Sequence, residues 1–120
     1  MLKLTAAVTV AGLIGLGALP AKSVQCDSQA QRSKEQLSRR ATAIGVARQI
    51  NTSEVGLFRA TKQYAPLAAL KNVSVPEGFE AQVSTDGLKY TFSVKDKVDA
   101  CGFALFSDQE GLIYDATPLQ

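Results

Sequence analysis

The segment "FEAQVSTDGLKYTFSVK", residues 79–95, carries two runs of alternating apolar and polar residues on either side of an Asp-Gly pair. Alternation with a period of two places the apolar side chains of a strand on one face of a sheet. Asp86-Gly87 is the dipeptide typical of a two-residue turn between antiparallel strands. The segment therefore predicts a β-hairpin with one apolar face and one polar face.

Two shorter apolar runs follow, at about residues 102–106 and 112–115. Between them, Asp108-Gln109-Glu110-Gly111 predicts a type I turn in which the glycine takes the left-handed position. Residues 79–116 are thus expected to form an antiparallel meander of three or four strands. Such a sheet keeps one apolar face that another element must cover.

Residues 28–64 supply the covering element, because their apolar side chains recur at three- and four-residue intervals. This spacing predicts one long amphipathic helix, capped by Asp27 or Ser28 and ended by Pro66. A helix followed by a meander is an α+β arrangement in which the helix packs on the sheet.

The face of the predicted helix opposite its apolar arc carries small or polar residues, among them Gly45, Thr52 and Gly56. Each glycine costs about 1 kcal/mol relative to alanine in a helix. The two glycines indicate either close approach of another backbone or a helix broken near Asn51.

Glu54 falls within the apolar arc of the same helix. We interpret it as a carboxylate that extends to the edge of the sheet, as long polar side chains do. The alternative is a partner for Arg48 or Lys62 that positions the helix or a neighbouring subunit.

Residues 1–23 are typical of a Sec-type signal peptide, with Lys3, an apolar run at 4–19 and small residues at the expected cleavage position. Residues 24–120 then form a single domain located in the periplasm or outside the cell. The alternative is an uncleaved anchor in the inner membrane, because the apolar run approaches the ~17 residues of a short spanning helix.

Cleavage after Ser23 changes the formal net charge from +2 to zero, because two of the thirteen basic residues leave and all eleven acidic residues stay. A nucleic-acid partner is therefore not expected. The basic residues Arg32, Lys34, Arg39 and Arg40 are interpreted as a solvated face. They would meet anionic lipid only if the leader stays uncleaved.

Cys26 and Cys101 are the two cysteines, and both belong to the exported part. An oxidising compartment favours a disulfide between them. A free thiol or an intermolecular bond remains the alternative.

Catalytic chemistry has few side chains to use, because the chain contains no histidine and no tryptophan. We expect no enzyme activity and no cofactor. A calcium site formed by Asp96, Asp99 and Asp108 is a weak alternative, since calcium takes about six to eight oxygen ligands. Glu110 and Asp115, near the second turn, do not complete such a set.

Two further stretches, "ARQINTSEVGLFRATKQYAPLAAL" at 47–70 and "FSDQEGLIY" at 106–114, resemble the type IV pilins and type II secretion pseudopilins. The resemblance implies a pilin-like fold and contacts with other pilin-like or envelope proteins, in or beside a pilus or secretion apparatus. The chain departs from the family because its apolar run lacks the Gly-Phe pair and the glutamate of a prepilin. A soluble periplasmic or secreted binding module with the same fold is the alternative.

The expected interaction surfaces lie on the predicted helix and in the loop 96–101. The oligomeric state is not predicted. The residues expected to form the surfaces are Gly45, Thr52, Glu54, Gly56, Asp96 and Asp99.

Overall fold

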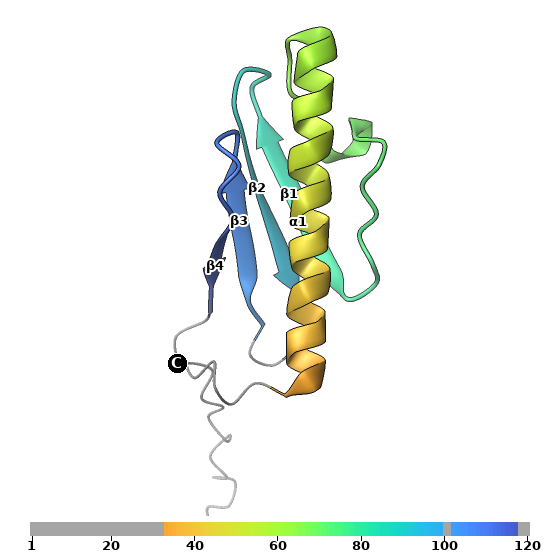
Figure 1. Ribbon diagram of the computed structural model, residues 1–120, viewed down its shortest axis with the longest axis vertical. Helices are drawn as coiled ribbons and strands as arrows, with labels where there is room; N and C mark the ends of the chain where they lie inside the picture. Colours follow the sequence, from red (N-terminus) through yellow and green to blue (C-terminus); the bar gives the residue numbers. More distant parts are fainter. Residues whose placement is uncertain (1–32, 100–101, 118–120) are drawn as a thin grey trace, which may run out of the picture.

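A long helix lies across one face of a four-stranded antiparallel sheet in the computed structural model, which describes residues 33–99 and 102–117 (Figure 1). This confirms the predicted α+β class. The elements are α1 (Lys34–Thr61), the 3₁₀ turn η2 (Leu67–Ala69), β1 (Phe79–Thr85), β2 (Tyr90–Asp96), β3 (Ala104–Asp108) and β4 (Tyr114–Ala116).

Helix α1 begins with a capping box between Ser33 and Gln36. The Ser33 hydroxyl accepts from the Gln36 backbone N–H, and the Gln36 side chain accepts from the Ser33 N–H. The helix then runs without interruption past Asn51, so the predicted alternative of a break there is wrong. The cap residues predicted from sequence, Asp27 and Ser28, lie outside the described residues.

The helix ends at Thr61, three residues before the predicted end, because Lys62 takes the left-handed conformation with φ 65°. The Lys62 N–H still donates to the Phe58 carbonyl oxygen. The chain then turns back, and the Tyr64 N–H donates to the Gly87 carbonyl oxygen in the β1–β2 turn. The helix therefore ends before Pro66, where the chain turns back to contact the sheet.

The sheet has the strand order β1-β2-β3-β4, with each strand antiparallel to the next. The first turn is centred on Gly87-Leu88, one residue later than the predicted Asp86-Gly87. The Asp86 N–H donates to the Lys89 carbonyl oxygen, and Gly87 takes φ 93° at the first central position. The Asp86 carboxylate accepts from the Leu88 and Lys89 N–H groups, which fixes the turn.

The second turn is confirmed as predicted. The Gly111 N–H donates to the Asp108 carbonyl oxygen at 2.9 Å, and Gly111 has φ 83°. A side chain other than glycine's would be strained in this conformation.

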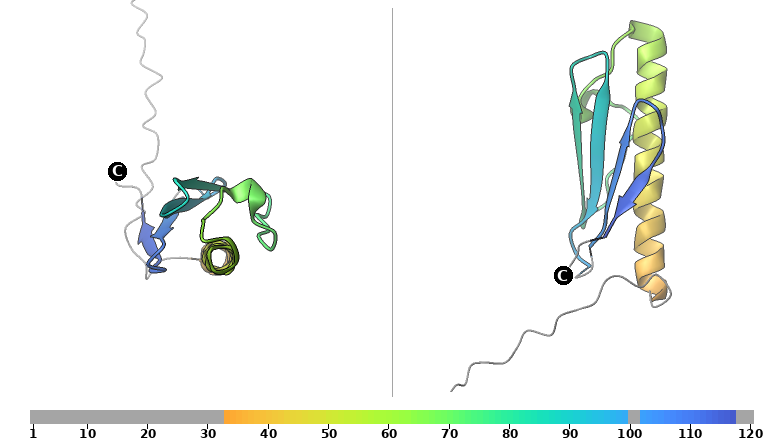
Figure 2. Two further views of the ribbon diagram at one scale, coloured as in Figure 1. Left: turned by 90° about the horizontal axis from the view of Figure 1, so that it is seen from above. Right: turned by 90° about the vertical axis from the view of Figure 1, so that its left-hand side faces the viewer.

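The core lies between α1 and strands β2 and β3, and α1 is seen end-on beneath the sheet in Figure 2. Two aromatic residues of the sheet lie outside this core, since Phe106 and Tyr114 are 45% and 57% exposed. The alternation of β3 turns Leu105 and Ser107 inward, so Phe106 and its cross-strand neighbour Tyr114 point outward. The buried apolar residues are Ala43, Val46, Ala47, Ile50, Leu70, Tyr90, Phe92, Val94, Phe103 and Leu105.

The predicted leader, Cys26 and Cys101 lie outside the described residues. Among residues 33–99 and 102–117, no helix is both long and apolar enough to cross a membrane.

Candidate functional site

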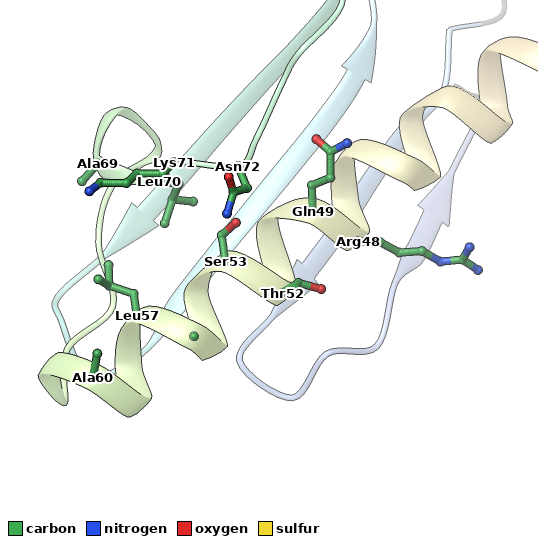
Figure 3. Close-up of a pocket in the computed structure, with 11 residues that line it drawn as sticks. Arg48, Gln49, Thr52, Ser53, Leu57, Ala60, Ala69, Leu70, Lys71 and Asn72 are labelled. Atoms are coloured by element: carbon green, nitrogen blue, oxygen red, sulfur yellow. The ribbon is translucent and has the colours of Figure 1, made fainter.

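A groove of about 610 Å³ runs between α1 and the segment 69–72 (Figure 3). We call it the α1 groove. The helix contributes Gln49, Ser53, Leu57 and Ala60, which point toward the segment 69–72 in Figure 3. The remaining lining residues are Arg48, Thr52, Gly56, Ala69, Leu70, Lys71 and Asn72.

The far wall of the α1 groove is held in place at three points. Leu70 is only 8% exposed and packs into the core. The Ser74 N–H donates to Gln49 Oε1 at 3.0 Å, and the Ala65 N–H donates to Glu54 Oε2 at 2.9 Å. The fold therefore fixes the shape of the groove, because the chain is hydrogen-bonded to α1 on both sides of the segment 69–72.

The α1 side of the groove includes small residues beside the longer Gln49 and Leu57. Thr52 and Gly56, two of the four helix residues predicted to form an interaction surface, line it together with Ala60. Gly45 lies nearer the start of α1 and is not among the residues that line the α1 groove. Within the part of the chain that the structure describes, a Cβ added at Gly45 or Gly56 would meet no atom within 4 Å. Neither glycine is therefore required by packing inside the described domain.

The rim of the α1 groove is basic. Arg48 and Lys71 line it, and Arg59 borders an adjoining hollow of about 390 Å³ that also contains Val55. In Figure 3 Arg48 extends away from the segment 69–72, toward the solvent side of α1. A partner surface that fits here combines apolar side chains with acidic ones.

Glu54 lies in the core, where it is fully buried. Its Oε2 accepts from the Ala65 N–H, whereas Oε1 has no hydrogen-bond partner among the described residues. Burial raises the pKa of the Glu54 carboxyl, and the hydrogen bond from Ala65 opposes this shift. The predicted extension to the sheet edge is wrong, and Glu54 is no part of an exposed interaction surface. Across the described residues it also forms no ion pair with Arg48 or Lys62.

Asp96 was expected in an exposed loop, but it is the last residue of β2 and is buried. Its carboxylate receives two hydrogen bonds of 2.7 Å from Arg39, one from Nε and one from Nη2. Oδ1 also accepts from the Val98 and Asp99 N–H groups. The bond from Arg39 is the largest cause that lowers the pKa of Asp96, and it outweighs the opposing effect of burial. Asp96 thus links β2 to α1 through Arg39 and is not exposed for contact with a partner.

Two of the three arginines expected on a solvated face, Arg39 and Arg40, form ion pairs inside the domain, whereas Arg32 lies outside the described residues. Arg39 also lies over the Phe79 ring, 4.6 Å from its centroid, which adds a cation–π contact to the ion pair with Asp96. Arg40 forms an ion pair with Asp115 of β4. The prediction of a solvated basic face is therefore wrong for both residues.

The carboxylates of the weak calcium alternative are not brought together. The Asp96 N–H donates to the Phe103 carbonyl oxygen at one end of the β2–β3 ladder, whereas Asp108 faces Thr91 at the other end. The Asp96 oxygens are occupied by Arg39 and by backbone N–H groups, and Asp108 Oδ1 accepts from the Glu110 N–H. Among the described residues, no group of three or more His, Cys, Asp or Glu side chains is placed to hold a metal ion.

Sequence reasoning missed the burial of Asp96, although the signal was present. Every second residue of β2 faces inward, so Asp96, two residues after the inward-facing Val94, is expected to face inward as well. It also missed the far wall of the α1 groove, because the segment 69–72 carries no periodic pattern that fixes its place beside α1.

The α1 groove offers hydroxyl, amide and aliphatic contacts with a basic rim, which is the chemistry of a contact surface. Thr52, Ser53 and Lys71 line it, but among the described residues no hydrogen bond joins either hydroxyl group to the Lys71 side chain. No family model matches this chain, and no curated protein and no solved structure matches it either.

Proposed function

We propose that this chain is an exported, non-enzymatic pilin-like protein that acts through protein–protein contacts in or beside a type IV pilus or type II secretion apparatus. The order of one long helix, a connecting segment and a four-stranded antiparallel meander supports this proposal. The resemblance of residues 47–70 and 106–114 to pilin-like sequences supports it independently of the fold.

The main observation behind the proposal is that α1 is packed on one side and leaves another side open for contact. One side packs on β2 and β3, and another side presents the α1 groove, whose lining includes Thr52, Gly56 and Ala60. These three residues are spaced four apart, so they form one ridge of small side chains along the helix. Helix axes in contact lie 8–10 Å apart depending on the side chains between them, and small residues permit the closer distances.

Glycine in a helix interior costs about 1 kcal/mol relative to alanine. Gly45 and Gly56 carry this cost although a Cβ at either position would meet only open space in the described domain. A partner helix that lies along this side of α1 would explain both glycines, because its backbone would occupy that space. The basic rim formed by Arg48 and Lys71 favours a partner with acidic side chains beside its apolar ones.

Site-specific photocrosslinking in the cells that make the protein tests this proposal on the full chain. A photoreactive side chain at Thr52 should crosslink to another exported pilin-like protein or to a second copy, in the membrane fraction. The same side chain at Lys95, which is exposed on the face of the sheet turned away from α1, is the control.

A protein that leaves the cells by osmotic shock as a monomer, with equal crosslinking from Thr52 and Lys95, would contradict the proposal. That result would favour a soluble binding module with the same fold. Mass spectrometry of the same preparation gives the mature N-terminus and the oxidation state of Cys26 and Cys101.

A further inference from the structure

The face of the sheet turned away from α1 carries four outward side chains in one line across the strands. Gln82 of β1 faces Ser93 of β2, Ser93 faces Phe106 of β3, and Phe106 faces Tyr114 of β4. We call these four residues the aromatic row. The helix lies on the other face of the sheet, as the view from above in Figure 2 shows.

The aromatic row lines a hollow of about 480 Å³. This volume lies within the range of roughly 300–1,000 Å³ found for small-molecule sites. Thr91 and Asp108, a cross-strand pair next to the row, border the hollow, and Ser84 lies beside Thr91. Asp108 Oδ1 accepts from the Glu110 N–H, which orients the carboxylate beside the row.

The two halves of this face differ in chemistry. On β3 and β4, Phe106 and Tyr114 are 45% and 57% exposed, although outward positions of a one-sided sheet are ordinarily polar. On β1 and β2, the outward positions that line the hollow hold an amide and hydroxyl groups. The outward pair Glu80 and Lys95 comes next along these strands, outside the hollow. Gln82 donates from Nε2 to Glu80 at 2.8 Å, so the amide is held by its neighbour on the strand.

The charge of the hollow restricts what can occupy it. Asp108 is its single charged lining residue, and of the described residues that line it none is basic. An anionic ligand such as a phosphate or a nucleic acid would therefore meet a carboxylate and no cation in the lining, since Lys95, farther along β2, faces Glu80. A sugar ring fits better, because its C–H face can lie on an aromatic ring while its hydroxyl groups bond to amide, hydroxyl and carboxylate groups.

We propose that the aromatic row is a binding site for an uncharged saccharide. The rings of Phe106 and Tyr114 contact the apolar face of the sugar, and Ser93, Gln82 and Asp108 bond to its hydroxyl groups. This inference goes beyond the protein contacts proposed above and does not depend on them, because the α1 groove and the aromatic row lie on different elements.

The test is a titration of the ¹⁵N-labelled full chain, followed by NMR, with chitotetraose, cellotetraose and maltotetraose. At least one of these should produce saturable shifts of the Ser93, Phe106 and Tyr114 amides with a Kd of about 1 mM or tighter. Tyr114→Leu and Phe106→Leu, which keep an apolar side chain but remove the flat ring, should each weaken binding about tenfold, roughly 1.4 kcal/mol.

Leu88→Ala is the matched control, because Leu88 is 69% exposed but lies in the β1–β2 turn, away from the aromatic row. It should bind the saccharide as the unmodified chain does. Dispersed amide spectra of all variants establish that each one is folded before its affinity is compared.

Four results would overturn the inference. The first three are the absence of saturable shifts with every saccharide, equal affinity in Tyr114→Leu, and tighter binding of an oligothymidylate than of any saccharide at the same amides. Shifts of the aromatic row that follow protein dilution alone would also overturn it, since they would assign this face to a second copy of the chain.

Discussion

Glu54 brings a carboxyl group into the core with one hydrogen bond, from the Ala65 N–H to Oε2. Burial raises its pKa, so the ionised form is disfavoured in the folded state. Glu54→Gln keeps an acceptor for the Ala65 N–H and removes the charge. We expect this substitution to raise the free energy of unfolding at pH 7 by about 1 kcal/mol.

Urea unfolding followed by circular dichroism measures the effect of Glu54→Gln. The gain should be smaller at about pH 3 than at pH 7, because at pH 3 the carboxyl group is protonated in both the folded and the unfolded state. Glu77→Gln is the control, because Glu77 is exposed and its substitution should change stability by less than about 0.5 kcal/mol. A loss of stability in Glu54→Gln that is equal at both pH values would contradict this account.

Single residues show where sequence patterns stop being informative. Helical spacing correctly places Glu54 in the apolar arc of α1, but its burial depends on Ala65 folding back along the helix. Strand alternation indicates the side on which Asp96 lies, but not its partner. Arg39 lies 57 positions earlier in the chain, and a pairing at that separation has no local signal.

At the scale of the element, α1 carries two glycines without a packing reason inside the described domain. Gly45→Ala and Gly56→Ala should therefore each raise the free energy of unfolding by about 0.5 to 1 kcal/mol, because alanine is favoured in a helix interior and a Cβ finds open space. Urea unfolding of the full chain at pH 7 is the measurement.

Gly102→Ala provides the contrast for these two helix variants. A Cβ at Gly102 would lie 2.8 Å from the Asp96 carbonyl oxygen, so this substitution should destabilise the protein. Destabilisation by Gly45→Ala or Gly56→Ala to the same extent would show that the helix glycines are required within the domain. The argument for a partner along α1 would then lose its basis.

Element types follow from the sequence more securely than element ends. The alternating runs predict the strands and the spacing predicts the helix, but the start of the helix is ambiguous for a physical reason. Ser28 and Gln31 have the same spacing as Ser33 and Gln36, so two capping boxes are encoded five residues apart. The structure uses the second, and local spacing alone does not distinguish them.

For the whole molecule, the change of period after Pro66 is enough to predict a helix that covers an antiparallel meander. The α1 groove is not predictable in the same way, because its far wall depends on contacts distant in sequence. The bond between Gln49 and Ser74 and the burial of Leu70 place the segment 69–72 beside α1. The aromatic row likewise requires the register of all four strands.

Two buried carboxyl groups give the whole domain a pH dependence with two limbs of opposite sign. The folded-state pKa of Asp96 is lowered, so its contribution is present above its unfolded pKa and is lost as the pH falls through the folded value. The folded-state pKa of Glu54 is raised, so its contribution is greatest below its unfolded pKa and is lost as the pH rises through the folded value. Asp86, whose pKa is lowered by the Leu88 and Lys89 N–H groups, adds to the acid limb.

We therefore expect the free energy of unfolding to be highest at about pH 4 to 5, between the two limbs. Urea unfolding of the full chain from pH 3 to pH 8 at constant ionic strength gives the profile. Glu54→Gln should flatten the limb toward neutral pH, because it removes the group whose ionisation is disfavoured by burial.

Asp96→Asn should lower stability by about 2 kcal/mol at pH 7, since the buried carboxylate accepts four hydrogen bonds, and should reduce the slope of the acid limb. Profiles of both variants that run parallel to that of the unmodified protein would show that other groups set the pH dependence.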